Sequence, residues 1–290
     1  MSGLFDPINL GDVMLRNRIA MSPMCQYQAH GDGVPTTWHT VHYVSRAIGG
    51  LGLVMTEMTD VAPIGRITEG CLGLWNTDQR DAFARIAESC RTYGAAVGVQ
   101  LAHAGRKSNL KEDIVAPSAI PFGPDNPVPR ALEIAEIEGI VEAFGRSAEL
   151  AVAAGFDVIE LHGAHGYLIH QFMSPSSNHR EDRYRDHARF ALDVIQEVRR
   201  HVPKGTPLVF RVSATETNED GYGLEDVLGM VDRFVEAGID AFDVTTSGNG
   251  PVRPEVYPGY QVRHAETFRC RYGLPVIAVG RLESPHLGSV

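Results

Sequence analysis

Short apolar runs alternate with longer amphipathic segments along the chain. Each run is rich in β-branched or other apolar residues, and few of its positions are polar. Such runs are typical of strands that are buried on both faces of a parallel sheet. The pattern therefore predicts seven strands, at residues 18–22, 52–58, 96–102, 156–162, 207–214, 241–246 and 275–280.

The segments between these runs have the periodicity of helices, and end signals mark several of them. The stretches "AAGFD" and "EAGID" place Gly155 and Gly238 between a helical segment and the next strand, a common way for a helix to end. In "NTD", Asn76, Thr77 or Asp78 could supply the N-cap of another helix. Helices are predicted at residues 39–49, 79–93, 133–154, 185–201, 224–237 and 262–272.

Unbroken alternation of strands and helices predicts an α/β fold with a parallel sheet. Over 290 residues it favours a (β/α)8 TIM barrel that forms a single domain, residues 1–290. Neither a G-x-G-x-x-G motif after the first strand nor a G-x-x-x-x-G-K-[ST] motif is present, so the Rossmann and P-loop folds lose their main support. Only about seven βα units are found, because the chain stops eleven residues after "PVIAV". We therefore expect a barrel that lacks its final unit.

Composition and charge exclude several classes of protein. A hydrophobic content of 43% and a charged content of 21% are those of a globular protein with a large core. A net charge of −10 without a basic run argues against a nucleic-acid surface. No apolar run reaches the ~18 residues of a membrane span, and "MSGLFDPINL" is not a signal peptide. The four cysteines are scattered without a C-x-x-C pair, which predicts free thiols, no metal site and a cytoplasmic location.

In α/β barrels the functional groups stand at the C-terminal ends of the strands. In this chain those ends carry many hydrogen-bond donors and few carboxylates. Such a set suits neither glycoside hydrolysis nor magnesium, and it fits a polar, anionic ligand. The residues at these ends are Ser22, Pro23, Met24, Cys25, Tyr27, Met58, Gln100, His162, His165, Arg211, Ser247, Gly248, Gly280 and Arg281.

The stretch "HGAHGYLIHQF" leaves several roles open for His162 and His165: metal ligands, acid–base groups, hydrogen-bond donors to a ligand, or buried polar residues. Taken alone, such histidines are more often structural, and a zinc site would need a third ligand. Arg211 in "FRVS" is harder to explain structurally, because a charge inside an apolar strand is costly unless it is paired. Gln100 is a weaker case of the same kind, and Cys25 alone is more often a small buried hydrophobe.

Taken together, the motifs resemble the Old Yellow Enzyme family of FMN-dependent ene-reductases, and within it the thermophilic-like branch. The resemblance covers essentially the whole chain. The stretches that carry it are "LFDPINLGDVMLRNRIAMSPMCQY", "QLAHAGRK", "APSAI", "GFDVIELHGAHGYLIHQFMSPSSNHR", "FRVSA", "PGYQV" and "VGR".

The resemblance implies a role for each residue that matches a family motif. Two histidines, His162 and His165, would hold the substrate carbonyl oxygen, Tyr27 would line the same pocket, and Tyr167 would be the proton donor. Fixed donors at the oxyanion that develops on a substrate are a strong form of catalysis, and they favour this reading of the histidines over metal binding. The residues that would contact FMN are Ser22, Pro23, Met24, Cys25, Met58, Gln100, Arg211, Gly280 and Arg281, the last two at its phosphate.

The implied activity is the NAD(P)H-dependent reduction of the activated C=C bond of α,β-unsaturated carbonyl compounds, with FMN as cofactor and NADPH or NADH as reductant. The implied partners are a small enone or enal and, as in the family branch, other copies of the chain. Two alternatives are a non-catalytic, weakly flavin-binding form, and a metal-dependent barrel hydrolase. The family's final segment carries a second Gly-Arg pair for the phosphate, so we expect this chain to bind FMN more weakly than a completed barrel would.

Overall fold

The computed structural model describes residues 3–110 and 113–284, and its centre is a nearly closed barrel of parallel strands. The strand order is β12-β11-β10-β9-β6-β4-β3, with the short β5 (Leu72–Gly73) joined to β4. Within the described residues, β12 and β3 form no pairing with each other. The seven strands are β3 (Ala20–Met21), β4 (Leu53–Asp60), β6 (Ala96–Ala102), β9 (Val158–Gly163), β10 (Leu208–Ser213), β11 (Ala241–Thr245) and β12 (Val276–Ala278).

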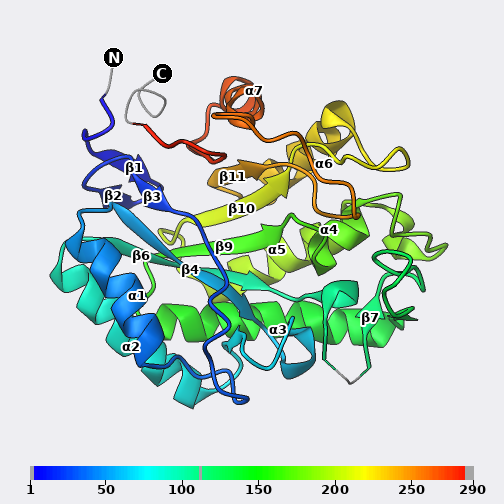
Figure 1. Ribbon diagram of the computed structural model, residues 1–290, viewed down its shortest axis with the longest axis horizontal. Helices are drawn as coiled ribbons and strands as arrows, with labels where there is room; N and C mark the ends of the chain where they lie inside the picture. Colours follow the sequence, from blue (N-terminus) through cyan, green and yellow to red (C-terminus); the bar gives the residue numbers. More distant parts are fainter. Residues whose placement is uncertain (1–2, 111–112, 285–290) are drawn as a thin grey trace.

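Helices cover the outside of the barrel, so the fold is the α/β barrel that the alternating pattern predicts (Figure 1). The long α3 lies beside α5 and packs its apolar face on the strands. Its buried residues include Phe144 and Ala148. The six helices that follow strands are α1 (Thr37–Ile48), α2 (Thr77–Thr92), α3 (Ile134–Ala153), α5 (Arg189–His201), α6 (Leu224–Glu236) and α7 (Val262–Tyr272).

All seven predicted strands and all six predicted helices are present, with shifts at their ends. The predicted helix 185–201 begins only at Arg189, because the single turn η3 (Arg183–Arg185) precedes it and is capped by the Asp182 carboxylate. The strand predicted to end near Met58 continues to Asp60. Gly155 and Gly238 have φ angles of 83° and 107° directly after α3 and α6, as expected for glycines that end helices.

A hairpin that the apolar pattern missed closes one end of the barrel. It consists of β1 (Ile8–Leu10) and β2 (Val13–Leu15), which pair antiparallel. Leu10 and Leu15 form an apolar cluster with residues at the start of several barrel strands, among them Val158 and Val209. The strands are too short to show a period, which explains why the pattern gave no signal for them.

The opposite end, where the strands terminate, is built from loops and short elements. These include η1 (Pro63–Gly65), η2 (Gly105–Lys107), the two-residue strands β7 (Val115–Ala116) and β8 (Arg130–Ala131), and the short helix α4 (Leu168–Met173). Because the hairpin covers the N-terminal end, this opposite end is the side from which a ligand can enter along the strands.

The N-cap of α2 gives a first test of the local structure. The Asn76 side chain accepts a hydrogen bond from the Gln79 backbone at 3.0 Å, and the Gln79 side chain accepts one from the Asn76 backbone at 3.2 Å. We expect Asn76→Ala to lower the free energy of unfolding by about 1 kcal/mol, because the Gln79 backbone N–H loses its side-chain acceptor. Urea denaturation would measure the loss. A Thr92→Ala variant at the other end of the helix should change stability much less, and equal losses would contradict the capping assignment.

Candidate functional site

A cavity of about 290 Å³ opens where the barrel strands end. This size is close to the lower limit of ~300 Å³ for small-molecule sites. Five different strands or their following loops contribute its walls, so residues far apart in the sequence meet there. The lining residues are Pro23, Cys25, Tyr27, Met58, Gln100, His162, His165, Tyr167 and Arg211, and the sequence analysis proposed all of them as site residues.

Two imidazoles stand together on one wall of the cavity. His162 is the penultimate residue of β9, and His165 follows in a left-handed backbone conformation with a φ of 57°. Their ring centroids are 5.2 Å apart, and the rings are nearly perpendicular. The loop between them is fixed, because the His165 amide donates to the Ser213 hydroxyl at 3.2 Å. The two rings are therefore held in one orientation toward the cavity.

The hydrogen bonds of the two rings indicate which nitrogens remain for a ligand. His162 Nδ1 accepts from the Ala164 amide at 3.4 Å, which places the ring proton on Nε2. His165 Nε2 lies 3.0 Å from Thr245 Oγ1, which leaves Nδ1 for the cavity. Burial lowers the pKa of both imidazoles well below the ordinary value, and the positive charges of Arg211 and Lys107 lower it further. Both rings are therefore neutral near pH 7. His162 offers an N–H at Nε2, and His165 offers one at Nδ1 when the Thr245 hydroxyl donates to its Nε2.

The hydroxyl of Tyr167 shares the same wall. Its ring centroid lies 4.8 Å from that of His162. Burial raises the pKa of Tyr167 well above its ordinary value, so the side chain keeps its proton at neutral pH. Within the described part of the chain this hydroxyl has no hydrogen-bond partner. The proton is therefore available to a ligand in the cavity.

Cys25 and Tyr27 also line the cavity, and their side chains hydrogen-bond to each other. Burial raises the pKa of the Cys25 thiol to about 12, and the nearby Cys71 and Glu57 act in the same direction. Burial also raises the pKa of Tyr27. A cysteine in this state is a neutral thiol at pH 7 and a weak nucleophile.

Two of the lining residues, Gln100 and Arg211, contact buried carboxyl groups inside the barrel. Gln100 Nε2 donates to Glu160 Oε1 at 2.7 Å, and Arg211 Nε lies 3.4 Å from Asp243 Oδ2. Burial raises the pKa of both carboxyl groups, that of Glu160 to about 8 with a further contribution from Asp243. The Arg211 guanidinium, which lines the cavity, is the cationic group beside these two carboxyl groups. The carbonyl oxygen of Gln100 also remains free for a ligand, because only its nitrogen bonds to Glu160.

These residues fit the isoalloxazine ring of FMN. The pyrimidine edge of that ring needs an acceptor for its N–H and donors for its carbonyl oxygens, and Gln100 and Arg211 supply both. Arg211 lines the cavity, and its buried Nε makes an ion pair with Asp243 but no hydrogen bond within the described residues. Met58 and Pro23 offer apolar surface for the face of a flat ring.

Four residues predicted to contact FMN do not line this cavity. Ser22 and Met24 lie beside it in the chain, and the Met24 side chain is exposed. Gly280 and Arg281 follow β12, where both have positive φ angles of 117° and 52°, and the Arg281 side chain forms an ion pair with Glu283 at 2.7 Å. Their roles at the ring and at the phosphate therefore stay predictions.

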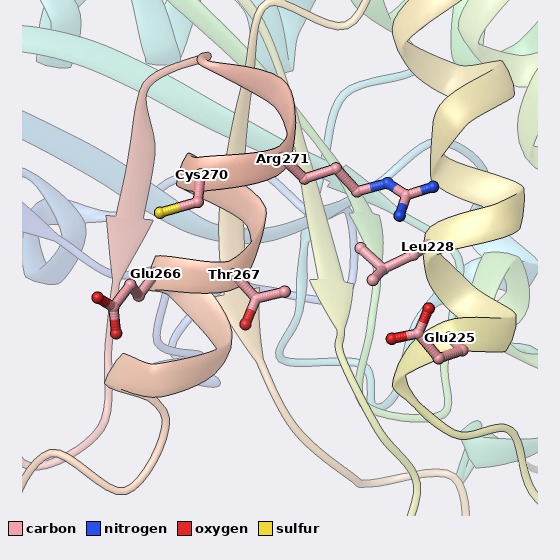
Figure 2. A pocket seen from close by; sticks show the side chains of 6 residues that line it. All are labelled: Glu225, Leu228, Glu266, Thr267, Cys270 and Arg271. Carbon is pink, nitrogen blue, oxygen red and sulfur yellow. The ribbon is translucent and has the colours of Figure 1, made fainter.

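A larger hollow of about 520 Å³ lies on the outside of the barrel between α6 and α7. Figure 2 shows its lining, which consists of Glu225, Leu228, Glu266, Thr267, Cys270 and Arg271. Most of these side chains are exposed, and Arg271 already pairs with Asp232 at 2.7 Å. Because no group of buried donors faces it, this hollow is a poorer candidate for chemistry than the smaller cavity.

Three polar residues of the site were missed by sequence reasoning. Glu160 and Asp243 are charges inside apolar strands, the same signal that pointed to Arg211, and it could have found them too. Lys107 in "QLAHAGRK" directly follows a strand end, but nothing in the sequence showed that it would reach the histidine loop.

Three further expectations concern metal sites, cysteines and membrane helices. Among the described residues, no group of three or more His, Cys, Asp or Glu side chains is arranged to hold a metal ion, so nothing in this part of the chain supports the hydrolase alternative. The four cysteines are all free thiols, as predicted. None of the described helices combines the length and the apolar character that crossing a membrane requires.

Comparisons with known proteins point in the same direction as the geometry. Residues 3–288 match the model of the NADH:flavin oxidoreductase / NADH oxidase family. The chain is 46% identical over 286 residues to an NADPH dehydrogenase of Geobacillus thermodenitrificans, covering 97% of this chain and 84% of the relative. A solved structure of morphinone reductase in complex with tetrahydroNAD is similar with a TM-score of 0.82 at 27% identity, covering 99% of this chain and 82% of that one. An old yellow enzyme homologue from Zymomonas mobilis gives a TM-score of 0.80 at 26% identity, with coverages of 99% and 91%.

Proposed function

Because the chain belongs to the NADH:flavin oxidoreductase / NADH oxidase family, and is therefore an oxidoreductase that uses FMN and NAD(P)H, we propose that it reduces the activated C=C bond of α,β-unsaturated carbonyl compounds. The observation that carries the proposal is the arrangement of three proton-bearing groups on one wall. His162, His165 and Tyr167 all line a cavity that Gln100 and Arg211 also line. FMN held in this cavity would supply hydride transfer from NAD(P)H to the β-carbon of the substrate.

Gln100 and Arg211 hold the pyrimidine edge of the cofactor in this proposal. The guanidinium would stabilise negative charge on the reduced cofactor, because a fixed cation in a buried site interacts strongly with an anion. Cys25, Pro23 and Met58 pack on the ring system. Gly280 and Arg281 are proposed to reach the phosphate, with Ser22 and Met24 beside the ring.

His162 and His165 bind the carbonyl oxygen of the substrate. As the β-carbon gains a hydride, negative charge develops on this oxygen, and the two imidazole N–H groups stabilise it. Neutral rings suit this task because each keeps one proton and donates it as a hydrogen bond without transferring it. The lowered pKa of both rings and their fixed orientation mean that the site needs no rearrangement as the charge appears.

Tyr167 supplies the proton that the α-carbon of the substrate requires. Its hydroxyl keeps its proton at neutral pH and lies on the same wall as the two histidines. With the carbonyl oxygen of the substrate bound by the two histidines, the neighbouring α-carbon would face the Tyr167 hydroxyl. Positioned general acids of this kind contribute a factor of about 10²–10⁴ to a rate.

Cys25 is proposed to tune the cofactor and not to form a covalent bond. We expect Cys25→Ala to shift the reduction potential of the bound flavin while activity persists, because the thiol would lie beside the ring but is too weakly acidic to act as a nucleophile. A spectroelectrochemical titration would measure the shift, with Cys270→Ala on the outer helix as a control that leaves it unchanged. A flavin–cysteine adduct seen by mass spectrometry during turnover would overturn this role.

The proposed reaction has a simple product test. Purified protein with FMN, NADPH and cyclohexenone under anaerobic conditions should form cyclohexanone in an amount equal to the NADPH consumed. Formation of cyclohexenol would mean that the carbonyl and not the alkene is reduced, and NADPH consumption without any product would refute the proposed substrate class. The predicted cytoplasmic location stays a prediction.

A further inference from the structure

Lys107 is a cation that lies against the proposed substrate wall without a carboxylate partner in the described part of the chain. It ends η2, directly after β6, and its side chain is half-buried. Its Nζ donates to the His165 carbonyl oxygen at 2.9 Å and to the Gly248 carbonyl oxygen at 3.3 Å. The ammonium charge is thus held by backbone carbonyl groups and is not neutralised by a nearby anion.

The ammonium also lies over aromatic rings. Lys107 Nζ is 5.1 Å from the ring centroid of Tyr167 and 4.6 Å from that of Phe122. Cations within ~6 Å of an aromatic ring are attracted to it. The charge therefore sits beside the side chain that we propose as the proton donor.

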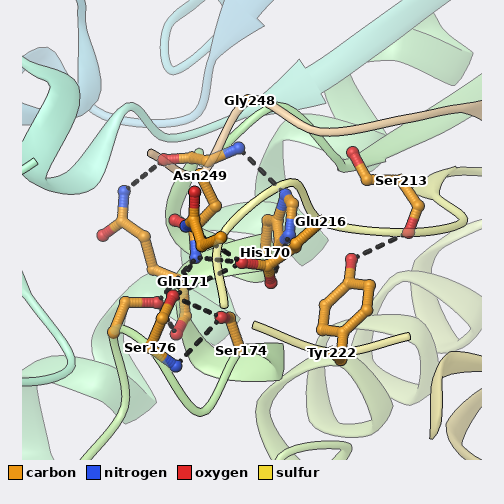
Figure 3. A network of polar contacts seen from close by, with 12 residues as sticks. His170, Gln171, Ser174, Ser176, Ser213, Glu216, Tyr222, Gly248 and Asn249 are labelled. Atoms are coloured by element: carbon orange, nitrogen blue, oxygen red, sulfur yellow. Dashed lines mark hydrogen bonds and ion pairs between the residues drawn. The ribbon is translucent and has the colours of Figure 1, made fainter. Parts of the chain in front are cut away.

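The Gly248 carbonyl that Lys107 contacts is held by a buried polar network. Arg106 donates to the backbone and side-chain oxygens of Asn249 at 2.7 and 3.0 Å. The Asn249 side chain in turn donates toward Glu216 at 3.4 Å, and Glu216 is bonded to His170 at 3.1 Å. Figure 3 shows Asn249, Glu216 and His170 converging beside Gly248. The Gly248 carbonyl oxygen is therefore held in place independently of the Lys107 side chain.

The second acceptor is equally fixed. His165 has a left-handed backbone conformation, its amide is bonded to Ser213, and the next amide, that of Gly166, donates to His170 Nδ1 at 2.9 Å. The Gly166 carbonyl accepts from the Gln171 side chain at 2.7 Å. With both carbonyl acceptors fixed, the ammonium has one location, close to Tyr167.

We propose that Lys107 is a further positioning residue for enone reduction, whose ammonium stabilises the negative charge left on Tyr167 after this residue protonates the substrate. The inference rests on the proposed function. In this step the Tyr167 O–H bond breaks, its proton forms a C–H bond at the substrate α-carbon, and the electron pair stays on the tyrosine oxygen until water returns a proton. An opposite charge within ~4–6 Å favours the ionised form of a group and so favours this transfer.

Several titratable groups surround Lys107, and their effects on the pH dependence of the rate have to be distinguished from that of Lys107. Burial, followed by the charge of Arg106, lowers the pKa of Lys107 to about 8, and burial lowers that of Arg106 to about 10. Glu160 inside the barrel also has a pKa of about 8. The remaining groups that face this region are His162, His165 and Tyr167 from β9 and its loop, Arg211 from β10, His170 from α4, and Glu216 from the loop after β10.

The sign of the pH dependence follows from the lysine. Its ammonium is present below a pH of about 8 and is lost above it, so the rate of enone reduction should fall as pH rises through this value. We expect this decline to be absent in Lys107→Met, which has no charge to lose, and in Lys107→Arg, which keeps its charge. The decline should persist in Glu160→Gln, which removes the carboxyl group that has a similar pKa and so shows that Lys107 causes the decline.

The experiment uses the FMN-loaded protein, reduced with dithionite and mixed anaerobically with cyclohexenone. Reoxidation by ferricyanide serves as a reference, since this one-electron acceptor takes no proton from the protein. At pH 7 we expect Lys107→Met to slow the enone reaction about tenfold relative to the ferricyanide reaction, and Lys107→Arg to restore most of the rate. In a Tyr167→Phe background, Lys107→Met should have an effect of less than about twofold, because the residue through which it acts is gone.

Three outcomes would overturn the role of Lys107: an unchanged enone rate in Lys107→Met, a tenfold loss that persists in the Tyr167→Phe background, or an unchanged decline near pH 8 in Lys107→Arg. The last test stands even where Lys107→Met does not fold. Failure of the proposed function looks different, because wild-type reduced protein would then react with ferricyanide and not with cyclohexenone.

Discussion

Replacing His162 and His165 together by alanine should slow enone reduction by roughly 10³–10⁵ while FMN stays bound. Each lost oxyanion donor costs a factor of ~10²–10³ in related sites, and the two losses are not expected to be strictly additive. The reason lies in the geometry: two neutral rings, 5.2 Å apart, offer their free nitrogens to one cavity. FMN should remain bound because the proposed contacts of its ring come mainly from Gln100 and Arg211.

The measurement is the anaerobic reoxidation of the reduced protein by cyclohexenone, with FMN content determined from the visible spectrum. His201→Ala provides a matched control, since this histidine ends the outer helix α5 and contacts Glu197 instead of the cavity. The control should react like wild type. A double variant that turns over cyclohexenone at the wild-type rate would remove the histidines from the mechanism.

Removing one oxygen atom with Tyr167→Phe should slow product formation by about 10²–10⁴. The ring would still pack against His162, so the change deletes the proton donor and little else. Single-turnover formation of cyclohexanone, followed by rapid quench, would measure the effect. Tyr93→Phe on the exposed end of α2 serves as the control. Equal rates in Tyr167→Phe and wild type would assign the proton to water or to another side chain.

Much of the fold and of the cavity lining could be predicted because both follow from one rule. In a parallel barrel the C-terminal ends of the strands meet at one mouth, so locating the strands also located residues such as Gln100, His162 and Arg211. The apolar runs were strong signals for these strands, since the observed β9 and β10 are buried along their whole length. The two-residue β3 gave a weaker signal, but Pro23, Cys25 and Tyr27, which follow it in the sequence, still line the cavity.

Features that depend on long-range contacts were not predictable in the same way. Lys107 reaches the His165 carbonyl across 58 positions of sequence, and no local pattern encodes this contact. The hairpin of β1 and β2 is too short to show a period. In contrast, Glu160 and Asp243 could have been found, because a carboxylate inside an apolar strand is as costly as the guanidinium of Arg211 and calls for the same explanation.

The most direct test of the account is a single mixing experiment. The FMN-loaded protein is reduced with an equimolar amount of NADPH, freed of oxygen, and mixed with cyclohexenone while the visible absorption of oxidised flavin and the products are followed together. We expect the flavin band to return at the rate at which cyclohexanone appears, in equal amounts. A reduced flavin that persists in the presence of cyclohexenone, or a band that returns without the saturated ketone, would contradict it.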